Sequence, residues 1–261
     1  MPASTPLAAT ALARREVVRF LRQRNRVTGA LVQPVMFWAL FGAGLSPSFR
    51  TGSVGYSEYF FPGIIVMVLL FTAIFATISI IDDRNSGFLQ GVLVAPVSRT
   101  AIVLGKILGT TVLAVGQALL VTVAAPIFGM SIGFAGILVS IPVLLLISIA
   151  LAGLGVCIAW RMDSTQGFHA IMMSFLMPLW LLSGAFFPPG GTPAWLSLLI
   201  ACNPLTYGVA LLRHALYLGN PAVTAQLPSL GLCLGATLAF AIAMLAGASS
   251  VARARSAGAV L

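Results

Sequence analysis

The stretch that decides the fold runs from residue 107 to residue 160 and contains no charged residue: ILGTTVLAVGQALLVTVAAPIFGMSIGFAGILVSIPVLLLISIALAGLGVCIAW. These 54 residues are too many for one membrane-spanning helix, which needs about 20 apolar residues. A GMSIG patch at residues 129–133 lies near the middle, and glycines of this kind favour a tight turn. The stretch therefore predicts a hairpin of two membrane-spanning helices, at residues 104–128 and 135–160.

The composition of the whole chain agrees with a membrane location. Hydrophobic residues make up 59% of the 261 residues, charged residues make up 7%, and the mean hydropathy is +1.06. A soluble domain carries about 25% charged residues, so this chain has too little polar surface to cover a globule in water. The three cysteines, Cys157, Cys202 and Cys233, are far apart and lack metal-ligand spacing, so neither a disulfide framework nor a metal site is expected.

Uncharged runs elsewhere in the chain set the other spans. With the hairpin they predict an all-α integral membrane protein of six spans, the other four lying at residues 27–46, 60–81, 168–187 and 228–250. Residues 188–227 are apolar but interrupted by prolines, and we expect an extracellular re-entrant or interfacial segment there. The alternative is a seventh span from Trp195 to Leu218, which would place Arg213 near the bilayer interior at a cost of about 2.5–3.5 kcal/mol.

The basic residues predict the orientation. The chain has 14 Lys and Arg against 5 Asp and Glu, and six arginines lie within residues 14–26, next to an apolar run. In so apolar a chain this cluster indicates an orientation signal beside the membrane, and no nucleic-acid partner is expected. Six spans place twelve basic residues on one side and only Arg50 and Arg213 on the other. Both termini are therefore predicted to be cytoplasmic.

Residues 1–26 are predicted to form an amphipathic helix along the cytoplasmic membrane surface. Its apolar side chains and its arginines are expected largely on opposite sides, the first being Leu12, Val17, Phe20 and Leu21 and the second Arg15, Arg19 and Arg22.

Several kinds of chemistry have no motif in this sequence. No acidic residue falls inside a predicted span, which argues against a carrier coupled to an ion gradient. Gly105-Lys106 is followed by Ile107 and lacks the upstream glycine of a phosphate-binding loop, so the chain is not expected to hydrolyse ATP. HExxH and GxSxG are also missing. We therefore assign no catalytic residue and no cofactor to this chain.

The loop between the second and third predicted spans reads DDRNSGFLQGVLVAPVSR over residues 82–99. Four apolar side chains within it share one helical face: Phe88, Leu89, Val92 and Leu93. Pro96 disfavours the helical conformation at the residue before it and ends the helix. A short amphipathic helix at about residues 84–95 is predicted in the cytoplasmic interface, with a plain interfacial linker as the alternative.

The same loop resembles the coupling-helix signature of the ABC transporter type-2 permease family. The shared pattern is acidic-Arg-x-x-Gly-x-x-Gln-x-x-Leu-x-x-Pro-x-Ser-Arg, from Asp83 to Arg99, followed by Gly-Lys. A second pair of motifs, LSGAFFP at 182–188 and NPLTY at 203–207, resembles the end of that family's fifth span and its outer segment. Many members carry Glu where this chain has Asp83 and Gln90, and no salt bridge is expected at position 90.

The resemblance implies a half-transporter. Two copies, or one copy and a close homologue, would dock on separate ATPase subunits that hold ATP and Mg, in the plasma membrane of a prokaryotic cell. The coupling helix would transmit the movement of the ATPase, and the residues assigned to it are Asp83, Arg84, Gly87, Gln90, Pro96 and Arg99.

The resemblance also implies export, along a route lined by the first, second and fifth spans. The aromatic and Met side chains proposed for this route suit an apolar or amphipathic drug, lipid or glycan, although each could instead face lipid or pack between helices: Phe37, Trp38, Phe71, Phe75, Met173, Met177 and Trp180. An outer gate or simple lid is expected at Pro188, Gly190, Asn203 and Pro204. The alternative functions are a scaffold subunit that binds an ATPase without transporting, and a passive channel.

Overall fold

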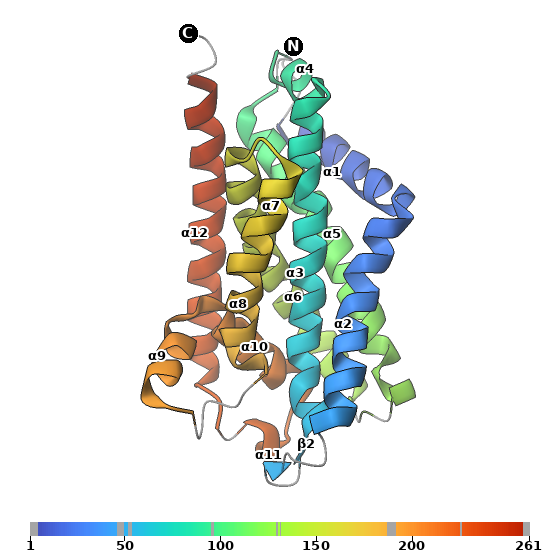
Figure 1. Ribbon diagram of the computed structural model, residues 1–261, viewed down its shortest axis with the longest axis vertical. Helices are drawn as coiled ribbons and strands as arrows, with labels where there is room; N and C mark the ends of the chain where they lie inside the picture. Colours follow the sequence, from blue (N-terminus) through green and yellow to red (C-terminus); the bar gives the residue numbers. More distant parts are fainter. Residues whose placement is uncertain are drawn as a thin grey trace.

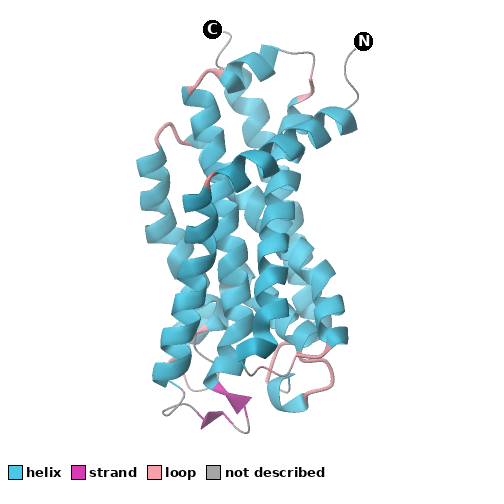
Figure 2. Ribbon diagram, turned by 90° about the vertical axis from the view of Figure 1, so that its right-hand side faces the viewer, coloured by secondary structure: helices cyan, strands magenta, loops and turns pink. Residues whose placement is uncertain are grey.

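The computed structural model describes residues 5–45, 50–51, 54–94, 97–128, 130, 132–186, 192–224 and 226–257, and these are almost entirely helical (Figure 2). Strands β1 (Arg50–Thr51) and β2 (Val54–Gly55) form one short antiparallel pair. Within the described residues, six helical segments are long and apolar enough to cross a membrane. The predicted all-α membrane fold is confirmed.

Five of the six spans are regular helices. They are α2 (Arg24–Leu45), α3 (Tyr56–Asn85), α5 (Arg99–Ala124), α6 (Phe134–Arg161) and α12 (Leu230–Ala257). A 3₁₀ turn, η1 (Ala125–Phe128), extends α5. Helix α3 is longer than the predicted span 60–81, because an uncharged run marks only the apolar part of a span and the helix continues into the polar interface.

The fifth span is a composite of α-helical and π-helical turns. Its segments are α7 (Thr165–Ile171), η2 (Met172–Leu176), α8 (Met177–Trp180) and η3 (Leu181–Ala185), where η2 and η3 are the π-helical turns. Pro178 has no N–H to donate back along the helix, which favours the irregular turn before it. The helical geometry breaks at Gly184, one residue before the end of η3. Its φ of +67° is the left-handed conformation that glycine adopts readily.

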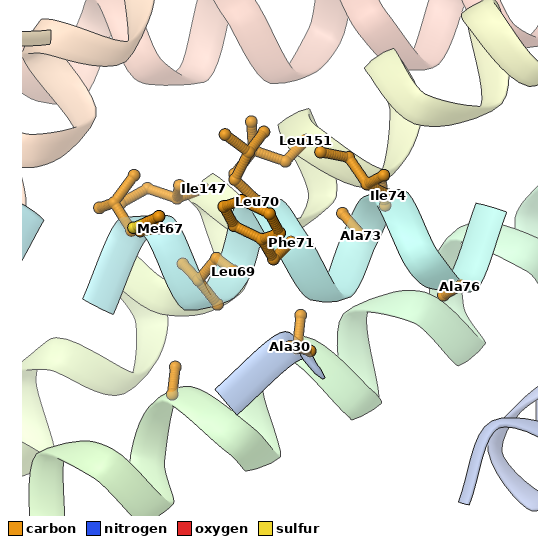
Figure 3. Packing of buried hydrophobic residues seen from close by; sticks show 14 of the residues in the cluster. Ala30, Met67, Leu69, Leu70, Phe71, Ala73, Ile74, Ala76, Ile147 and Leu151 are labelled. Atoms are coloured by element: carbon orange, nitrogen blue, oxygen red, sulfur yellow. The ribbon is translucent and has the colours of Figure 1, made fainter. Parts of the chain in front are cut away.

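Helix α3 is the centre of the bundle. Its most apolar window is 94% buried by the neighbouring helices. Figure 3 shows Leu70 and Phe71 of α3 beside Leu151 of α6 and Ala30 of α2. Because α3 is surrounded by other helices, a displacement of α3 would disturb the packing of most of the molecule.

One end of the bundle carries α1 (Thr5–Arg22) and α4 (Phe88–Val94), and is called the α4 end below (Figure 1). Helix α1 is oblique to the spans and is separated from α2 by Gln23 alone, so residues 24–26 belong to the first span and not to the surface helix. Gly87, with φ of +74°, separates α3 from α4. Helix α4 is therefore shorter than the predicted 84–95, and Arg84 belongs to α3.

The opposite end, called the α10 end, carries α9 (Ala194–Cys202), α10 (Pro204–Leu216) and α11 (Pro221–Thr224) (Figure 1). Helices α9 and α10 meet at Asn203 with a bend of 80°. The pair is therefore not one straight helix, as an ordinary seventh span would be. The Asn203 side chain caps α10 by accepting a hydrogen bond from the N–H of Leu205. Both helices lie at the same end of the bundle, as a re-entrant segment does.

Candidate coupling site

A buried ion cluster joins three helices at the α4 end. Lys106 of α5 donates from Nζ to Oδ2 of Asp83 on α3 at 2.6 Å and to Oε1 of Glu16 on α1 at 2.5 Å. Ser79 donates to the other oxygen of Glu16 at 2.6 Å. The Asp83 side chain is 1% exposed, and those of Glu16 and Lys106 are each 4% exposed. One ammonium group therefore bridges two carboxylates that are almost completely buried.

Arginines surround this cluster. Arg15 makes a bidentate pair with Asp83 at 2.9 and 3.1 Å, which raises the pKa of Arg15 above its usual value. Arg19 also contacts Asp83, at 2.5 Å. Arg26, at the start of α2, pairs with Asp82 at 2.9 Å. The network therefore connects the first two spans, the third span and α1.

The sequence brings α1 close to α5 through small residues. Ala9, Glu16 and Phe20 recur at helical spacing and form the buried face of α1. Opposite them on α5 are Gly105 and Gly109, where an added Cβ would lie 2.7 Å from the Cβ of Leu12 and 2.8 Å from that of Glu16, respectively. This contact needs glycine, and it brings Glu16 within reach of Lys106.

The orientation of α1 differs from the amphipathic pattern expected from its sequence. Phe20 is buried as expected, but Leu21 is exposed, and Arg15 and Arg19 are directed toward Asp83. The ion pairs explain the difference, because they make an arginine face suitable for packing against the protein.

The structure places the six predicted coupling residues in different settings. Asp83 faces its own subunit, and a contact of its carboxylate with another protein is not available in this arrangement. Arg84 binds the end of α6, donating to the carbonyls of Trp160 and Met162 at 2.8 and 2.7 Å and to Asp163 at 3.0 Å. Arg99 is exposed and donates to the carbonyl of Arg253.

Of the other three residues, two belong to α4 or to the turn before it. Gly87 forms the turn before α4, Gln90 lies within it, and Pro96 lies outside the described residues. Leu89 is buried and anchors α4 to the bundle, whereas Phe88 is 38% exposed. The Arg15 guanidinium carbon lies 3.6 Å from the centre of the Phe88 ring, a cation–π contact. Helix α4 is thus attached to both α3 and α1.

The residues predicted for the substrate route divide into two sets. Trp38, Phe71 and Trp180 are buried within the subunit. The Trp38 and Trp180 indole N–H groups donate to the carbonyls of Ser57 and Gly63, so these side chains hold helices together. The second set is exposed or half-buried, and all but the exposed Met173 still pack against the core: Phe37, Phe75, Met173 and Met177.

A groove of about 500 Å³ follows one face of α2. Phe37, one of the residues predicted for the route, contributes to it, whereas the polar side chains of the groove were not predicted, because only aromatic and Met side chains were assigned to the route. The groove is lined by Asn25, Thr28, Gly29, Val32, Gln33, Met36, Phe37 and Leu40. Among the polar side chains of the groove, Gln33 lies farthest into the span from its first residue. An amide inside a predicted span is unusual, and this feature of the sequence could have identified the groove.

At the α10 end, two of the predicted gate residues, Pro188 and Gly190, lie outside the described residues. Asn203 and Pro204 form the bend between α9 and α10, and the Asn203 amide donates to the carbonyl of Leu179 at 2.6 Å. The bend is therefore attached to the last turns of the fifth span.

Arg213 of α10 was not predicted as a site residue, and its side chain is 3% exposed. It donates to the carbonyls of Gly184 at 3.0 Å and Tyr59 at 3.2 Å, and its guanidinium lies 4.0 Å from the centre of the Tyr59 ring. The Tyr59 hydroxyl donates to the same Gly184 carbonyl at 2.7 Å. These contacts connect α10 with the start of α3 and the end of the fifth span.

Comparison with known proteins places this arrangement in a family. The family model of the ABC-2 type transporter matches residues 8–217, which include most of α1, the ion cluster, α4 and α10. The chain belongs to the ABC-2 type transporter family. It is accordingly a membrane permease subunit of an ABC transporter, as the resemblance of the coupling motif predicted.

Several members of the ABC-2 type transporter family are similar to this chain. Nodulation protein J of Rhizobium leguminosarum is 26% identical over 219 residues, covering 83% of this chain and 84% of that protein. The daunorubicin resistance ABC transporter permease DrrB1 of Streptomyces coeruleorubidus is 22% identical, covering 72% and 67%. The transport permease ycf38 of Cyanophora paradoxa is 27% identical, covering 77% of this chain and 71% of that protein.

Proposed function

We propose that this chain is the permease of an exporter, driven by ATP and Mg on a separate ATPase subunit that docks on α4 at the cytoplasmic side. The observation that carries the proposal is the position of α4. It projects from the end of α3, keeps Phe88 partly exposed, and is anchored by Leu89. Because α3 is the buried centre of the bundle, a push on α4 would reach the other spans directly.

The ATPase contact belongs to the outward surface of α4 and not to the buried Asp83. Gly91 is exposed on α4, and a side chain added there would meet nothing within 4 Å. Gly91→Arg therefore changes the proposed docking surface while leaving the ion cluster intact. Gly231, exposed at the start of α12 at the opposite end, has the same open surroundings and provides the matched control Gly231→Arg.

The experiment is co-purification of the tagged chain in mild detergent, with mass spectrometry of the bound proteins. The native chain and Gly231→Arg should bring an ATPase subunit in stoichiometric amount, and Gly91→Arg should lose it. An ATPase bound equally well by Gly91→Arg would show that α4 is not the docking surface. No ATPase with the native chain would favour a different partner or a channel.

A second copy is proposed to face α2. The exposed large side chains of α12 are Leu and Ile, as expected for contact with lipid. The groove on α2 instead carries Thr28 and Gln33 beside Met36. Polar side chains within a span are more stable against protein or a polar ligand than against hydrocarbon. The α2 face is therefore the proposed position of the second copy and of the cargo.

The cargo is proposed to be an apolar or amphipathic molecule that moves outward. The side chains that line the α2 groove carry no formal charge, and Met36 and Phe37 among them suit a loosely fitted apolar group. Everted vesicles containing the chain and its ATPase should accumulate such a compound when ATP is added. A scaffold subunit would show no ATP-dependent accumulation, and a passive channel would only equilibrate the compound across the membrane, with or without ATP.

A further inference from the structure

The arginines near the N-terminus divide into two groups in the structure. Arg15, Arg19 and Arg26 pair with the acidic residues of the ion cluster and its surroundings. Arg14 and Arg22 of α1 are exposed, as is Arg24 at the start of α2, and among the described residues no carboxylate forms an ion pair with any of the three. Two positive charges of α1 are therefore uncompensated within the described part of the chain.

These two arginines share one side of α1 with apolar residues. Leu7, Val18 and Leu21 are exposed, and their helical spacing places them beside Arg14 and Arg22. These five residues are called the outward face of α1. A helix face that combines exposed leucines or valines with arginines is typical of helices that lie in the interface of a membrane.

The position of α1 agrees with that environment. Only Gln23 separates its last residue from α2, which is the first membrane-spanning helix. Helix α1 then runs obliquely across the end of the bundle (Figure 1). The last residue of α1 therefore adjoins the start of a span. A helix in this position lies at the depth of the lipid headgroups, where phosphate groups are the abundant anions.

We propose that the outward face of α1 binds anionic phospholipids. Arg14 and Arg22 contact the headgroup phosphates, and Leu7, Val18 and Leu21 lie among the upper parts of the acyl chains. The opposite face of the same helix is fixed to α5 by the Glu16–Lys106 pair, so lipid binding stabilises the whole α4 end. The proposal uses charge and position on α1 only and does not depend on the proposed function.

The test compares thermal unfolding of the full chain in nanodiscs of phosphatidylcholine alone and with increasing phosphatidylglycerol. Ligand that binds only the folded state raises the unfolding temperature, so the native chain should become more stable as phosphatidylglycerol increases. One arginine beside an anionic surface strengthens binding about fivefold, so Arg14→Gln with Arg22→Gln should lose more than half of this rise. Added NaCl should reduce the rise for the native chain.

Three further measurements separate a defined site from general attraction. Arg161 and Arg253 are exposed at the ends of their helices, and the double variant Arg161→Gln/Arg253→Gln removes the same charge elsewhere and should retain the rise. Arg14→Lys with Arg22→Lys keeps the charge and should also retain it. Equal unfolding temperatures of all variants in pure phosphatidylcholine would show that folding is intact, and the single variants replace any double variant that does not fold.

Two results would overturn the proposal. The first is a full phosphatidylglycerol response in the Arg14→Gln/Arg22→Gln variant. The second is an equal loss in the Arg161→Gln/Arg253→Gln control, which would mean that the total charge of the chain and not the outward face of α1 determines the response.

Discussion

Lys106 is the most deeply buried cation of the ion cluster, and it contacts both Glu16 and Asp83. We expect Lys106→Met to lower the stability of the folded chain by about 3–5 kcal/mol, the cost of removing one partner from buried ion pairs. Thermal unfolding in detergent, followed by size-exclusion chromatography, would measure the change. Arg161→Met removes an exposed cation and should leave the unfolding temperature nearly unchanged. Similar behaviour of the two variants would contradict the assigned role of Lys106.

Arg213 offers a second test at the scale of one residue. Arg213→Met removes the donors to Gly184 and Tyr59 but keeps a side chain of similar length, and hydrogen bonds from a charged group are worth about 1.5–3 kcal/mol. Arg213→Lys should recover only part of this stability, because an ammonium group lacks the planar guanidinium that lies over the Tyr59 ring. The unfolding temperatures should rank native, Lys and Met. A Met variant as stable as the native chain would show that the connection is dispensable.

The sequence contains part of the information about these side chains. Glu16 repeats at helical spacing with Ala9 and Phe20, which is a readable sign that it faces the protein. The contacts of Arg213 could not be predicted, because they depend on how α10 folds back against the start of α3 and the end of the fifth span. A buried indole N–H needs a hydrogen-bond partner, and those of Trp38 and Trp180 both find one in the backbone carbonyl of another helix, which the sequence does not identify.

At the scale of helices, the contact between α1 and α5 depends on two glycines, Gly105 and Gly109. We expect Gly109→Val to destabilise the chain by about 1–3 kcal/mol, because the new side chain would overlap α1 near Glu16. Gly116→Val is the matched control on the same helix, since a Cβ there meets nothing within 4 Å. Thermal unfolding of the two variants would measure the difference. An equal effect of both would indicate that helix propensity, and not the α1 contact, determines the result.

Hydropathy predicted the existence of the helices more accurately than it predicted their end points. Apolar runs located six spans because only the hydrocarbon region requires apolar residues. The end of α3 and the start of α4 depend instead on the local conformation of Gly87. The irregular turns of the fifth span depend on Pro178 and Gly184. Proline and glycine were visible in the sequence, but their effect inside a span depends on the carbonyls and side chains that surround them.

At the scale of the whole molecule, the proposed second copy can be tested by crosslinking. Met36 on α2 and Ile242 on α12 are similarly exposed, at 55% and 58%. With the three native cysteines replaced by Ser, Met36→Cys should form an oxidation-dependent crosslinked dimer in membranes, whereas Ile242→Cys should remain monomeric. The reason is that the α2 face carries the Gln33 amide beside Met36, whereas the large exposed side chain near Ile242 on α12, Leu238, is apolar. A crosslink confined to Ile242→Cys would place the second copy on α12 instead.

The architecture of the whole molecule followed from the sequence more completely than its polar sites did. The family and the six-span fold are both confirmed, since each depends on motifs and apolar runs that are local in the chain. The ion cluster unites residues from position 16 to position 106, and its assembly depends on the close packing of α1, α3 and α5. Interactions between such distant positions are set by tertiary packing, which a single sequence does not display.

Lys106 is the only lysine in the sequence, and it is enclosed by the ion cluster. An amine-selective reagent, which modifies free and neutral lysine side chains, should therefore react very slowly with this position in the folded chain. The reaction would become fast only when α1 separates from α5. Mass spectrometry of the peptide that contains Lys106 would then report how often this part of the molecule opens, and ATP added to the assembled transporter would show whether that opening belongs to the working cycle.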